Sequence, residues 1–326
     1  MRHVVVSEWT AVEDLPNMPV LDAPDPEPNE GQVVVAVEAA SVSYVNALAC
    51  TGNYQFKPTL PFTPGGSCAG VVSAVGAGVD ASLVGRRVLT GGGGCATHVT
   101  APAAGVIELP DDVDAATAAS IPESYGTMHF TYWQRAPLEP GQQVVVLGAG
   151  GAIGLAAIDL AKAAGARVIA CASSAEKLAA ATAVGADATI DYGEPGVDLK
   201  TAIREATGGG ADVVVDPIGG DLAEPAMRAL GFDGRYLVLG FAAGSIPRFP
   251  LNLALLNNRA IIGVEFGGWA MRQPSRFNEV TRAVIEMAGD GRIHPLEPTP
   301  FSLEDTGRLC HALMTRGIAG RAVVTP

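Results

Sequence analysis

One stretch of the sequence decides the fold: Val144-Val145-Val146-Leu147-Gly148-Ala149-Gly150-Gly151-Ala152-Ile153-Gly154. Its four leading apolar residues do not alternate with polar ones, which predicts a strand buried on both faces. The glycine cluster allows a tight turn and lets backbone N–H groups approach a ligand where no Cβ intervenes. A helical pattern follows through Ala164, so the positive end of that helix faces whatever the loop holds, which favours a pyrophosphate. Because a second strand follows at residues 167–171, this strand–turn–helix setting is stronger evidence than an isolated glycine motif.

The residues after the second strand indicate which dinucleotide is bound. A cofactor with a free ribose 2′-hydroxyl usually meets an Asp or Glu about 20 residues beyond the glycines. Here the strand continues into Ser173, Ser174 and Lys177, so two hydroxyls and an ammonium group replace the expected acid. These groups favour a 2′-phosphate, and therefore NADPH over NADH. The alternative is that a serine caps the next helix and Lys177 is solvated, and both can hold because a helix N-terminus also binds phosphate.

Length and charge restrict the class of protein. The chain has 326 residues, more than one hydrophobic core usually supports, so two domains are expected. No apolar run approaches the roughly 18 residues that a membrane helix needs, and the first residues are charged too early for a signal peptide. The net charge of −13 argues against nucleic acid and anionic membrane surfaces as partners. An anionic cofactor must therefore be held by local positive groups.

The cysteines give no sign of a disulfide framework or a structural zinc site. They are odd in number, widely scattered, and form no CxxC pair. We expect each to be a small buried apolar residue, in a protein of the reducing cytoplasm. They are Cys50, Cys68, Cys95, Cys171 and Cys310.

From about residue 123 to 267, strand and helix patterns alternate. Six strands separated by crossover helices predict an α/β fold with a doubly wound parallel sheet covered on both faces. Ligands of such sheets bind beyond the carboxyl ends of the strands, so we expect the loops at 148–154, 216–220 and 240–244 to surround one crevice. The expected strands are 144–147, 167–171, 188–190, 212–216, 235–240 and 260–266, and the expected helices lie near 153–164, 175–184, 198–206, 222–230 and 251–257.

The first 120 residues have a different pattern. Short alternating runs at 32–37, 70–75, 87–90 and 105–109 are broken by Pro and Gly clusters, which is typical of an irregular antiparallel barrel. After residue 267 we expect a helix at about 274–289 and a terminal strand at 322–325, and we expect this segment to return to the first domain. No internal repeat is present.

Taken together, the chain resembles the medium-chain dehydrogenase/reductase superfamily, and within it the zinc-free NADPH:quinone oxidoreductase-like branch. The resemblance covers the chain nearly from end to end, and its motifs occur in the order of the family. Besides the loop at 148–154, they are Leu60-Pro61-Phe62-Thr63-Pro64-Gly65, Gly70-Val71-Val72-Ser73-Ala74-Val75-Gly76, Tyr125-Gly126-Thr127, Ala172-Ser173-Ser174-Ala175-Glu176-Lys177-Leu178, Gly185-Ala186-Asp187, Asp191-Tyr192, Asp212-Val213-Val214-Val215-Asp216, Gly219-Gly220 and Gly240-Phe241.

The resemblance implies a GroES-like substrate domain at 1–122, completed by 268–326, and a Rossmann dinucleotide-binding domain at 123–267. It also implies NADPH as cofactor and a homodimer formed through the last strand of the Rossmann sheet. In the family, Lys177 and Tyr192 would contact the 2′-phosphate end, and Thr127 would lie near the nicotinamide. The cofactor-binding residues expected are Ser43, Thr127, Gly148, Ala149, Gly150, Gly151, Ala152, Ile153, Gly154, Ser173, Ser174, Lys177, Tyr192, Gly240 and Phe241.

The positions that match the zinc ligands of the alcohol dehydrogenase branch do not carry the residues found there. In that branch the catalytic zinc needs Cys or His ligands at three positions. The matching positions carry Ser43, Gly66 and, near the junction, Glu123 or Ser124, and the four-cysteine lobe of that branch is missing. His98 and His129 remain, but an isolated His on an apolar stretch is more often a core or surface residue. We therefore expect no metal.

Without zinc, reduction of a quinone or an α,β-unsaturated carbonyl is easier than alcohol oxidation, because conjugation spreads the incoming charge onto oxygen. Tyr54 is the expected catalytic donor to the substrate carbonyl, since it matches a tyrosine of related enoyl-thioester reductases. The alternative is an aromatic residue packed under the Pro-rich loop that follows. Trp269, Phe241 and Met128 are candidates for an apolar pocket or for core packing. Asp216 either orients a loop or caps backbone N–H groups.

The chain departs from the family pattern at four positions: Ser43, Cys50, Ser67 and Arg86, where relatives often have Asn, Arg, Glu and Asp. These changes leave the cofactor domain intact but alter the substrate pocket. The leading hypothesis is an NADPH-dependent oxidoreductase that transfers hydride to a quinone or an enone without metal. The alternatives are a 2-enoyl-thioester reductase and, from another class, an NADPH-binding protein with little or no turnover.

Overall fold

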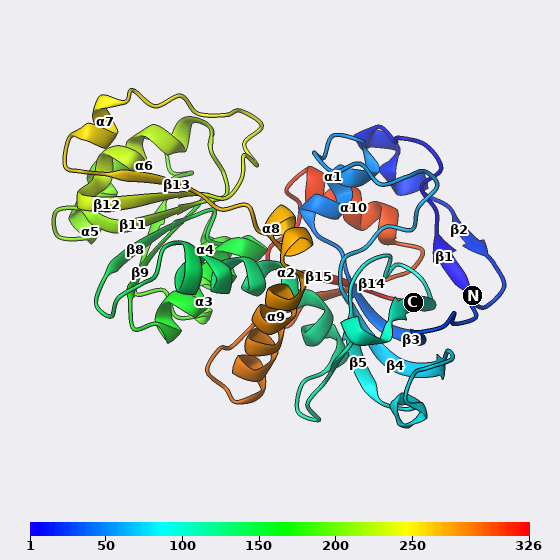
Figure 1. The fold of residues 1–326 in the computed structure, drawn as a ribbon. Helices are drawn as coiled ribbons and strands as arrows, with labels where there is room; N and C mark the ends of the chain where they lie inside the picture. The colour runs from blue at the N-terminus through cyan, green and yellow to red at the C-terminus, as the bar shows by residue number, and fades with distance from the viewer. The chain divides into compact units, whose positions relative to one another are not determined.

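Two units, each with its own sheet, make up the computed structural model, which describes residues 1–326 (Figure 1). The first unit comprises Met1–Glu123, Thr281–Asp290 and Leu296–Pro326. The second comprises Ser124–Val280 and Gly291–Pro295. The chain therefore leaves the first unit twice and returns to it each time, and each unit is described by itself below.

The second unit is built on a six-stranded sheet in the order β10-β9-β8-β11-β12-β13. All five pairings are parallel, which confirms the doubly wound sheet predicted from the sequence. The strand order reverses between β8 and β11, and ligands of such sheets bind at this switch point. The strands are β8 (Gln143–Leu147), β9 (Arg167–Ala172), β10 (Ala188–Asp191), β11 (Ala211–Asp216), β12 (Leu230–Val238) and β13 (Ala260–Gly263).

Helices cover both faces of this sheet, as the unbroken apolar strands require. One pair of neighbouring helices contacts β8, β9 and β10, and the other pair contacts β10, β11 and β12. The core beneath the second pair of helices contains Val145, Leu147 and Ile169. Alternate residues of each strand therefore point to opposite faces of the sheet. The first pair is α3 (Ala152–Ala163) and α4 (Ala175–Ala183), the second is α5 (Leu199–Ala206) and α6 (Ala223–Ala229), and the short α7 (Asn252–Leu255) also joins that core.

The last strand is shorter than the sequence predicts. Residues 260–266 form one mainly apolar run, but β13 ends at Gly263 and Phe266 begins a helix, α8 (Phe266–Arg272). The Glu265 side chain accepts a hydrogen bond from the Gly268 N–H and so caps that helix. Phe266 packs in an aromatic cluster with Phe130 and Trp269, whose ring centroids lie 5.6 and 5.7 Å from its own. Burial against these rings therefore ended the strand.

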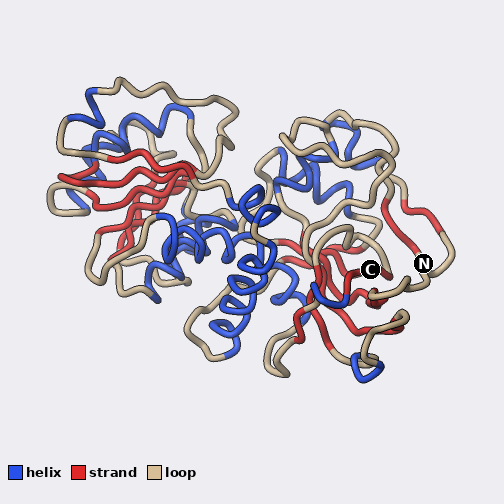
Figure 2. Tube along the Cα trace, viewed as in Figure 1, coloured by secondary structure: helices blue, strands red, loops and turns tan.

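The first unit contains a seven-stranded, mostly antiparallel sheet in the order β14-β15-β3-β4-β5-β7, with β6 also paired to β3. Figure 2 colours the strands of both units red. Only β14 and β15 run parallel. The terminal strand β15 pairs with β3, so the last residues of the chain complete a sheet that begins near its start. The strands are β3 (Gln32–Ser41), β4 (Cys68–Val75), β5 (Arg87–Thr90), β6 (His98–Pro102), β7 (Ile107–Glu108), β14 (Thr299–Ser302) and β15 (Ala322–Thr325), and β1 (Arg2–Val4) pairs with β2 (Val20–Asp22).

Several elements of the chain carry too weak a sequence pattern to be expected. Strands β1, β2, β6 and β14 are short, and the helices α1 (Tyr44–Cys50) and α10 (Thr306–Met314) pack against each other in the first unit. The longer α2 (Ala115–Phe130) and α9 (Pro274–Gly289) each carry residues of both units, and α9 has the bounds that the sequence predicts. The expected strand at 105–109 is only the two-residue β7, preceded by a turn of 3-10 helix at Ala103–Gly105.

The cysteines lie where the sequence predicts. All five are free and buried. Burial raises the pKa of Cys68, Cys95 and Cys171 to about 12, so these side chains are neutral thiols near pH 7. They act as small apolar residues of the core.

Candidate functional site

The glycine loop of the second unit is shaped by close packing. Gly148 follows β8 with φ of +61°, and a Cβ there would lie 2.6 Å from Ile218 Cδ1. A Cβ on Gly154 would lie 2.4 Å from the Gly148 carbonyl oxygen, so helix α3 begins directly against the loop. Gly151 is the N-cap of α3 and supplies no side-chain cap. The first N–H groups of α3 therefore remain available to an anion.

Lys177 lies beside this loop. A Cβ on Gly150 would lie 2.5 Å from the Lys177 Cβ, so the aliphatic stem of the lysine packs on the glycine. Lys177 is half-buried, and its ammonium group pairs with no carboxylate of the protein. Packing thus holds the base of the Lys177 side chain against the loop, and the ammonium group keeps its hydrogen-bonding capacity unused.

The other residues expected at the 2′-phosphate end gather at the ends of β9 and β10. Ser173 is exposed directly after β9, whereas the Ser174 hydroxyl accepts the Lys177 N–H at 3.4 Å and caps α4. The Tyr192 N–H donates to the Ala172 carbonyl oxygen at 3.0 Å. Ser173 and Tyr192 therefore follow the ends of the neighbouring strands β9 and β10, Lys177 lies near the start of α4, and the Ser174 hydroxyl caps that helix.

Asp216 fixes two neighbouring loops of the same sheet edge. The residue is 1% exposed, and its Oδ1 accepts the N–H groups of Ile218 and Gly219 at 2.7 and 2.8 Å. The Tyr236 hydroxyl donates to Oδ2 at 2.5 Å. Asp216 thus caps backbone N–H groups and, by doing so, holds the loop after β11.

That loop is in turn joined to the loop after β12. The Ala242 and Ala243 N–H groups donate to the carbonyl oxygens of Pro217 and Ile218 at 3.2 and 2.8 Å. A Cβ on Gly219 would lie 3.0 Å from the Phe241 ring, which is 40% exposed. Since Ile218 also contacts Gly148, the three glycine-containing loops lie next to one another as the sequence predicts.

The first unit has a cavity of about 310 Å³ that contains Tyr54. The Tyr54 ring packs edge to face on Phe56, with centroids 5.7 Å apart. The role of Tyr54 as a donor to the substrate carbonyl stays a prediction. The cavity is small and mainly apolar, with few polar side chains. Its lining residues are Val45, Asn46, Ala49, Tyr54, Phe56, Pro58, Phe62, Thr63, Pro64, Gly65 and Gly93.

Beside this cavity, Ser43 and Asn46 form a capping box that the sequence analysis missed. The Ser43 N–H donates to Asn46 Oδ1 at 2.8 Å, and the Asn46 N–H donates to Ser43 Oγ at 3.4 Å. The pattern Ser-x-x-Asn before helix α1 is the available sequence signal. Glu123 hydrogen-bonds to Ser43, and burial raises the pKa of its carboxyl, although part of the residue remains accessible. Ser43 is thus already engaged within the first unit.

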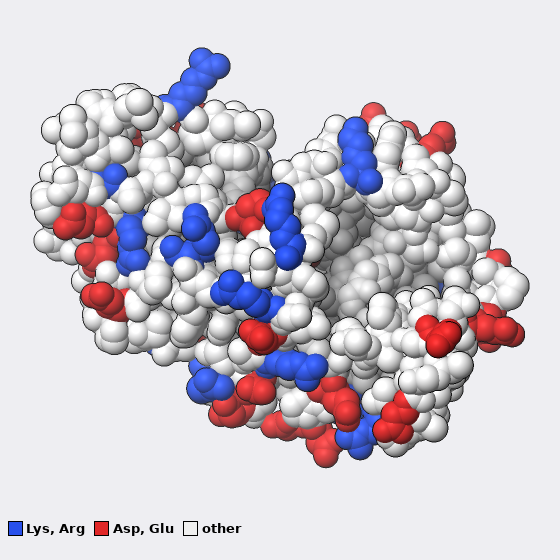
Figure 3. Space-filling view, viewed as in Figure 1, with Lys and Arg blue, Asp and Glu red and all other residues white.

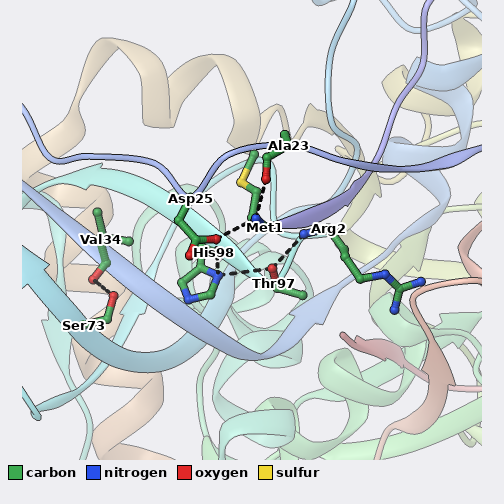
Figure 4. Close-up of polar contacts among 8 residues, drawn as sticks. All are labelled: Met1, Arg2, Ala23, Asp25, Val34, Ser73, Thr97 and His98. Atoms are coloured by element: carbon green, nitrogen blue, oxygen red, sulfur yellow. Dashed lines mark hydrogen bonds and ion pairs between the residues drawn. The ribbon is translucent and has the colours of Figure 1, made fainter.

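The positions that match zinc ligands do not form a metal site. Among residues 1–326, no group of three or more His, Cys, Asp or Glu side chains could hold an ion. His98 contacts Thr97 at 3.1 Å and lies beside Asp25, which accepts the amino group of Met1 (Figure 4). His129 stacks on Trp133 with centroids 4.7 Å apart, and burial together with the charge of Arg292 lowers its pKa.

Three further residues of interest lie in helices of the second unit. Thr127 is half-buried in α2, where its carbonyl oxygen accepts the Thr131 hydroxyl at 2.7 Å. Met128 is fully buried and belongs to the core. Trp269 stacks in the aromatic cluster, and the Arg276 guanidinium lies 5.4 Å from its ring centroid. The role of Thr127 near a nicotinamide stays a prediction.

Acidic and basic side chains are interspersed on the face shown in Figure 3, although the net charge is −13. An anionic ligand would therefore depend on individual positive groups such as Lys177 rather than on the overall field. None of the helices is long and apolar enough to cross a bilayer.

Comparison with known proteins identifies the family. Residues 29–111 match the alcohol dehydrogenase GroES-like domain, and residues 152–286 match the zinc-binding dehydrogenase domain. Quinone oxidoreductase-like protein 2 of Bos taurus is 34% identical over 90% of this chain and 85% of its own length. The quinone oxidoreductase of Rattus norvegicus is 30% identical over 93% and 91%. The structure of the Thermus thermophilus quinone oxidoreductase, also solved in complex with NADPH, has a TM-score of 0.84 and 29% identity over the full length of both chains.

The fold and the glycine loop therefore define a two-domain dehydrogenase/reductase with a GroES-like and a Rossmann unit. The chain belongs to the medium-chain dehydrogenase/reductase superfamily, in its quinone oxidoreductase-like branch. The residues present fit the cofactor named for the Thermus structure. The N-terminus of α3 has no side-chain cap, Lys177 is unpaired, and no acid follows Ala172 at the end of β9.

Replacing Asp216 by Ala should destabilise the second unit. Two loop N–H groups and the Tyr236 hydroxyl would lose their acceptor inside the protein, which costs about 3 kcal/mol in the free energy of unfolding. Urea unfolding followed by circular dichroism measures the change, and Asp221→Ala in the exposed neighbouring turn is the matched control. A loss of less than about 1 kcal/mol in Asp216→Ala would show that the loops are held by other contacts.

Proposed function

We propose that this protein is an NADPH-dependent oxidoreductase that transfers hydride to a quinone or an α,β-unsaturated carbonyl without a metal ion. The observation that carries the proposal is the unpaired Lys177 packed on Gly150, beside an uncapped helix N-terminus and without an acid at the end of β9. The free ribose 2′-hydroxyl of NADH would have no carboxylate to bind there. The 2′-phosphate of NADPH would instead lie next to the ammonium group of Lys177 and the hydroxyl of Ser173. Membership of the quinone oxidoreductase-like branch supports the same interpretation.

In such a reaction, different residues of the chain would bind the cofactor, donate a hydrogen bond to the acceptor and exclude water. The first N–H groups of α3 would hold the pyrophosphate, and Lys177 with Ser173 would hold the 2′-phosphate. NADPH supplies the hydride when bound. Tyr54 would donate a hydrogen bond to the acceptor's oxygen, where negative charge develops as the carbon is reduced. The apolar walls of the cavity, such as Phe56 and Phe62, would exclude water from a planar acceptor.

The test is the oxidation of NADPH, followed by its absorbance, with 1,4-benzoquinone, a simple enone and crotonyl-CoA as separate acceptors. Turnover with the first two is the expected result. Turnover confined to crotonyl-CoA would favour a 2-enoyl-thioester reductase. Tight NADPH binding without oxidation by any acceptor would contradict the proposal and favour a cofactor-binding protein.

Replacing Lys177 by Ala should weaken NADPH binding by about 10- to 100-fold, because one charge-assisted contact with the 2′-phosphate is lost. The affinity for NADH should hardly change. Quenching of intrinsic fluorescence measures both dissociation constants, with the exposed Lys200→Ala on α5 as control. Equal losses for the two nucleotides would remove Lys177 from recognition of the 2′-phosphate.

Replacing Tyr54 by Phe should lower kcat for the best acceptor by about 100-fold, since one donor to the developing oxyanion is removed while the ring contact with Phe56 is kept. The dissociation constant of NADPH should stay the same. Tyr44→Phe, on the exposed side of α1, is the control. Unchanged turnover would leave Tyr54 with a packing role alone.

We also propose that two copies of the chain associate through β13, the edge strand of the parallel sheet. The strand has one unpaired side, and Ile261 within it is 42% exposed. Exposed leucines lie in the segment just before it: Leu251, Leu255 and Leu256 are 82%, 78% and 57% exposed. An open edge next to apolar side chains favours pairing with a second strand.

Replacing Ile261 by Glu should convert a dimer into a monomer, because a charge would be buried at the new interface. Sedimentation velocity measures the mass, and Val197→Glu, near the opposite edge of the sheet, should stay dimeric. A wild-type chain that sediments as a monomer would contradict this interface.

A further inference from the structure

The side-chain amide of Asn46 has a fixed orientation. Its Oδ1 lies 2.8 Å from the Ser43 backbone nitrogen and 3.0 Å from Ser43 Oγ. A backbone N–H can only donate, so the atom that faces it must be the amide oxygen and cannot be the NH2 group. The capping box thereby decides which half of the amide remains for other partners.

The remaining half is a free donor at the cavity wall. Asn46 lines the cavity of about 310 Å³ together with Tyr54. Its Nδ2 makes no hydrogen bond within the protein, yet it is not among the buried polar atoms that lack a partner, so it is open to the solvent or a ligand. Asn46 and Tyr54, whose side chains each carry a hydrogen-bond donor, therefore line the same small, mainly apolar cavity.

The carboxyl group in the surroundings of Asn46, that of Glu123, has a raised pKa. Asn46 Oδ1 and Glu123 Oε2 both lie beside Gly66, at 3.5 and 3.7 Å from the point that a Cβ there would occupy. Burial raises the pKa of Glu123, the hydrogen bond from Ser43 lowers it, and no charged side chain contributes. The carboxyl therefore stays uncharged to a higher pH than an ordinary glutamic acid, which limits repulsion of an oxyanion nearby.

We propose that Asn46 is a further catalytic residue, whose NH2 group donates a hydrogen bond to the carbonyl oxygen of the acceptor beside the donor Tyr54. Ser43 is a positioning residue that holds the amide oxygen away from the substrate. The proposal rests on the proposed function and names the second donor of that site. Asn46 transfers no proton: it stabilises the charge that moves onto the oxygen when the conjugated carbon is reduced.

The decisive variant is Asn46→Asp, which keeps an oxygen acceptor for the Ser43 N–H and so preserves the cap of α1. It replaces the donor by a negatively charged oxygen at the same place. We expect kcat for enone reduction to fall by about 100- to 1,000-fold, with unchanged NADPH affinity. Asn53→Asp adds the same charge on the exposed side of the neighbouring loop and should keep kcat within about twofold.

A second measurement needs neither turnover nor NADPH. p-Nitrophenol, a planar phenol, is titrated spectrophotometrically in the presence of the wild-type protein. A site with two donors should favour the phenolate and lower the pKa of the bound phenol, whereas Asn46→Asp should raise it. Ser43→Ala should weaken the preference, and Ser43→Thr, which keeps the hydroxyl, should restore it.

The two lines of evidence separate the possible failures. A wild-type protein without preference for the phenolate, or an Asn46→Asp protein that keeps both the preference and the enone turnover, would overturn the role of Asn46. If the wild type oxidises NADPH with none of the acceptors but still prefers the phenolate, the proposed reaction fails while the donor site stands.

Discussion

The close approach of helix α3 to the glycine loop is the constraint on which the second unit depends. The Gly148 carbonyl oxygen lies 2.4 Å from the position of a Cβ on Gly154, so no side chain fits between loop and helix. Because Gly151 offers no cap, the first N–H groups of the helix are left for a ligand. The packing of Lys177 on Gly150 then adds a positive charge to the same place. In the proposed function, the loop, the first turn of α3 and Lys177 together hold the phosphates of the cofactor.

Backbone N–H groups orient the key polar side chains in both units. Asp216 accepts two of them and thereby fixes the loop that contacts Gly148 through Ile218. Asn46 accepts one from Ser43, which fixes the orientation of its amide. In each case a buried or half-buried donor would be costly without an acceptor, so satisfying the main chain also positions the side chain. The same bond serves stability and, in our proposal, the site.

The first unit shows how a dehydrogenase of this superfamily can differ at the position of the metal. Gly66 provides no ligand, and Ser43 is engaged in the cap of α1. Serine, asparagine and a glutamic acid with raised pKa lie around Gly66, where zinc would need soft or imidazole ligands. In the proposed reaction, neutral hydrogen-bond donors therefore replace a Lewis acid. They are sufficient for a conjugated acceptor, because conjugation delocalises the negative charge that develops on reduction.

The sequence by itself determined the Rossmann unit, because unbroken apolar strands and amphipathic crossovers repeat a local pattern that needs no distant partner. It also predicted the proximity of the three loops, since parallel strands end at one edge. Tertiary structure alone decided the end of β13 at Gly263, because Phe266 is buried against the ring of Phe130, which is distant in sequence. It also decided the pairing of β15 with β3 across most of the chain. It alone placed Lys177 on Gly150 and turned Asn46 toward the cavity of Tyr54. Contacts between residues far apart in sequence leave no periodic signal, and only packing and hydrogen bonding in three dimensions select them.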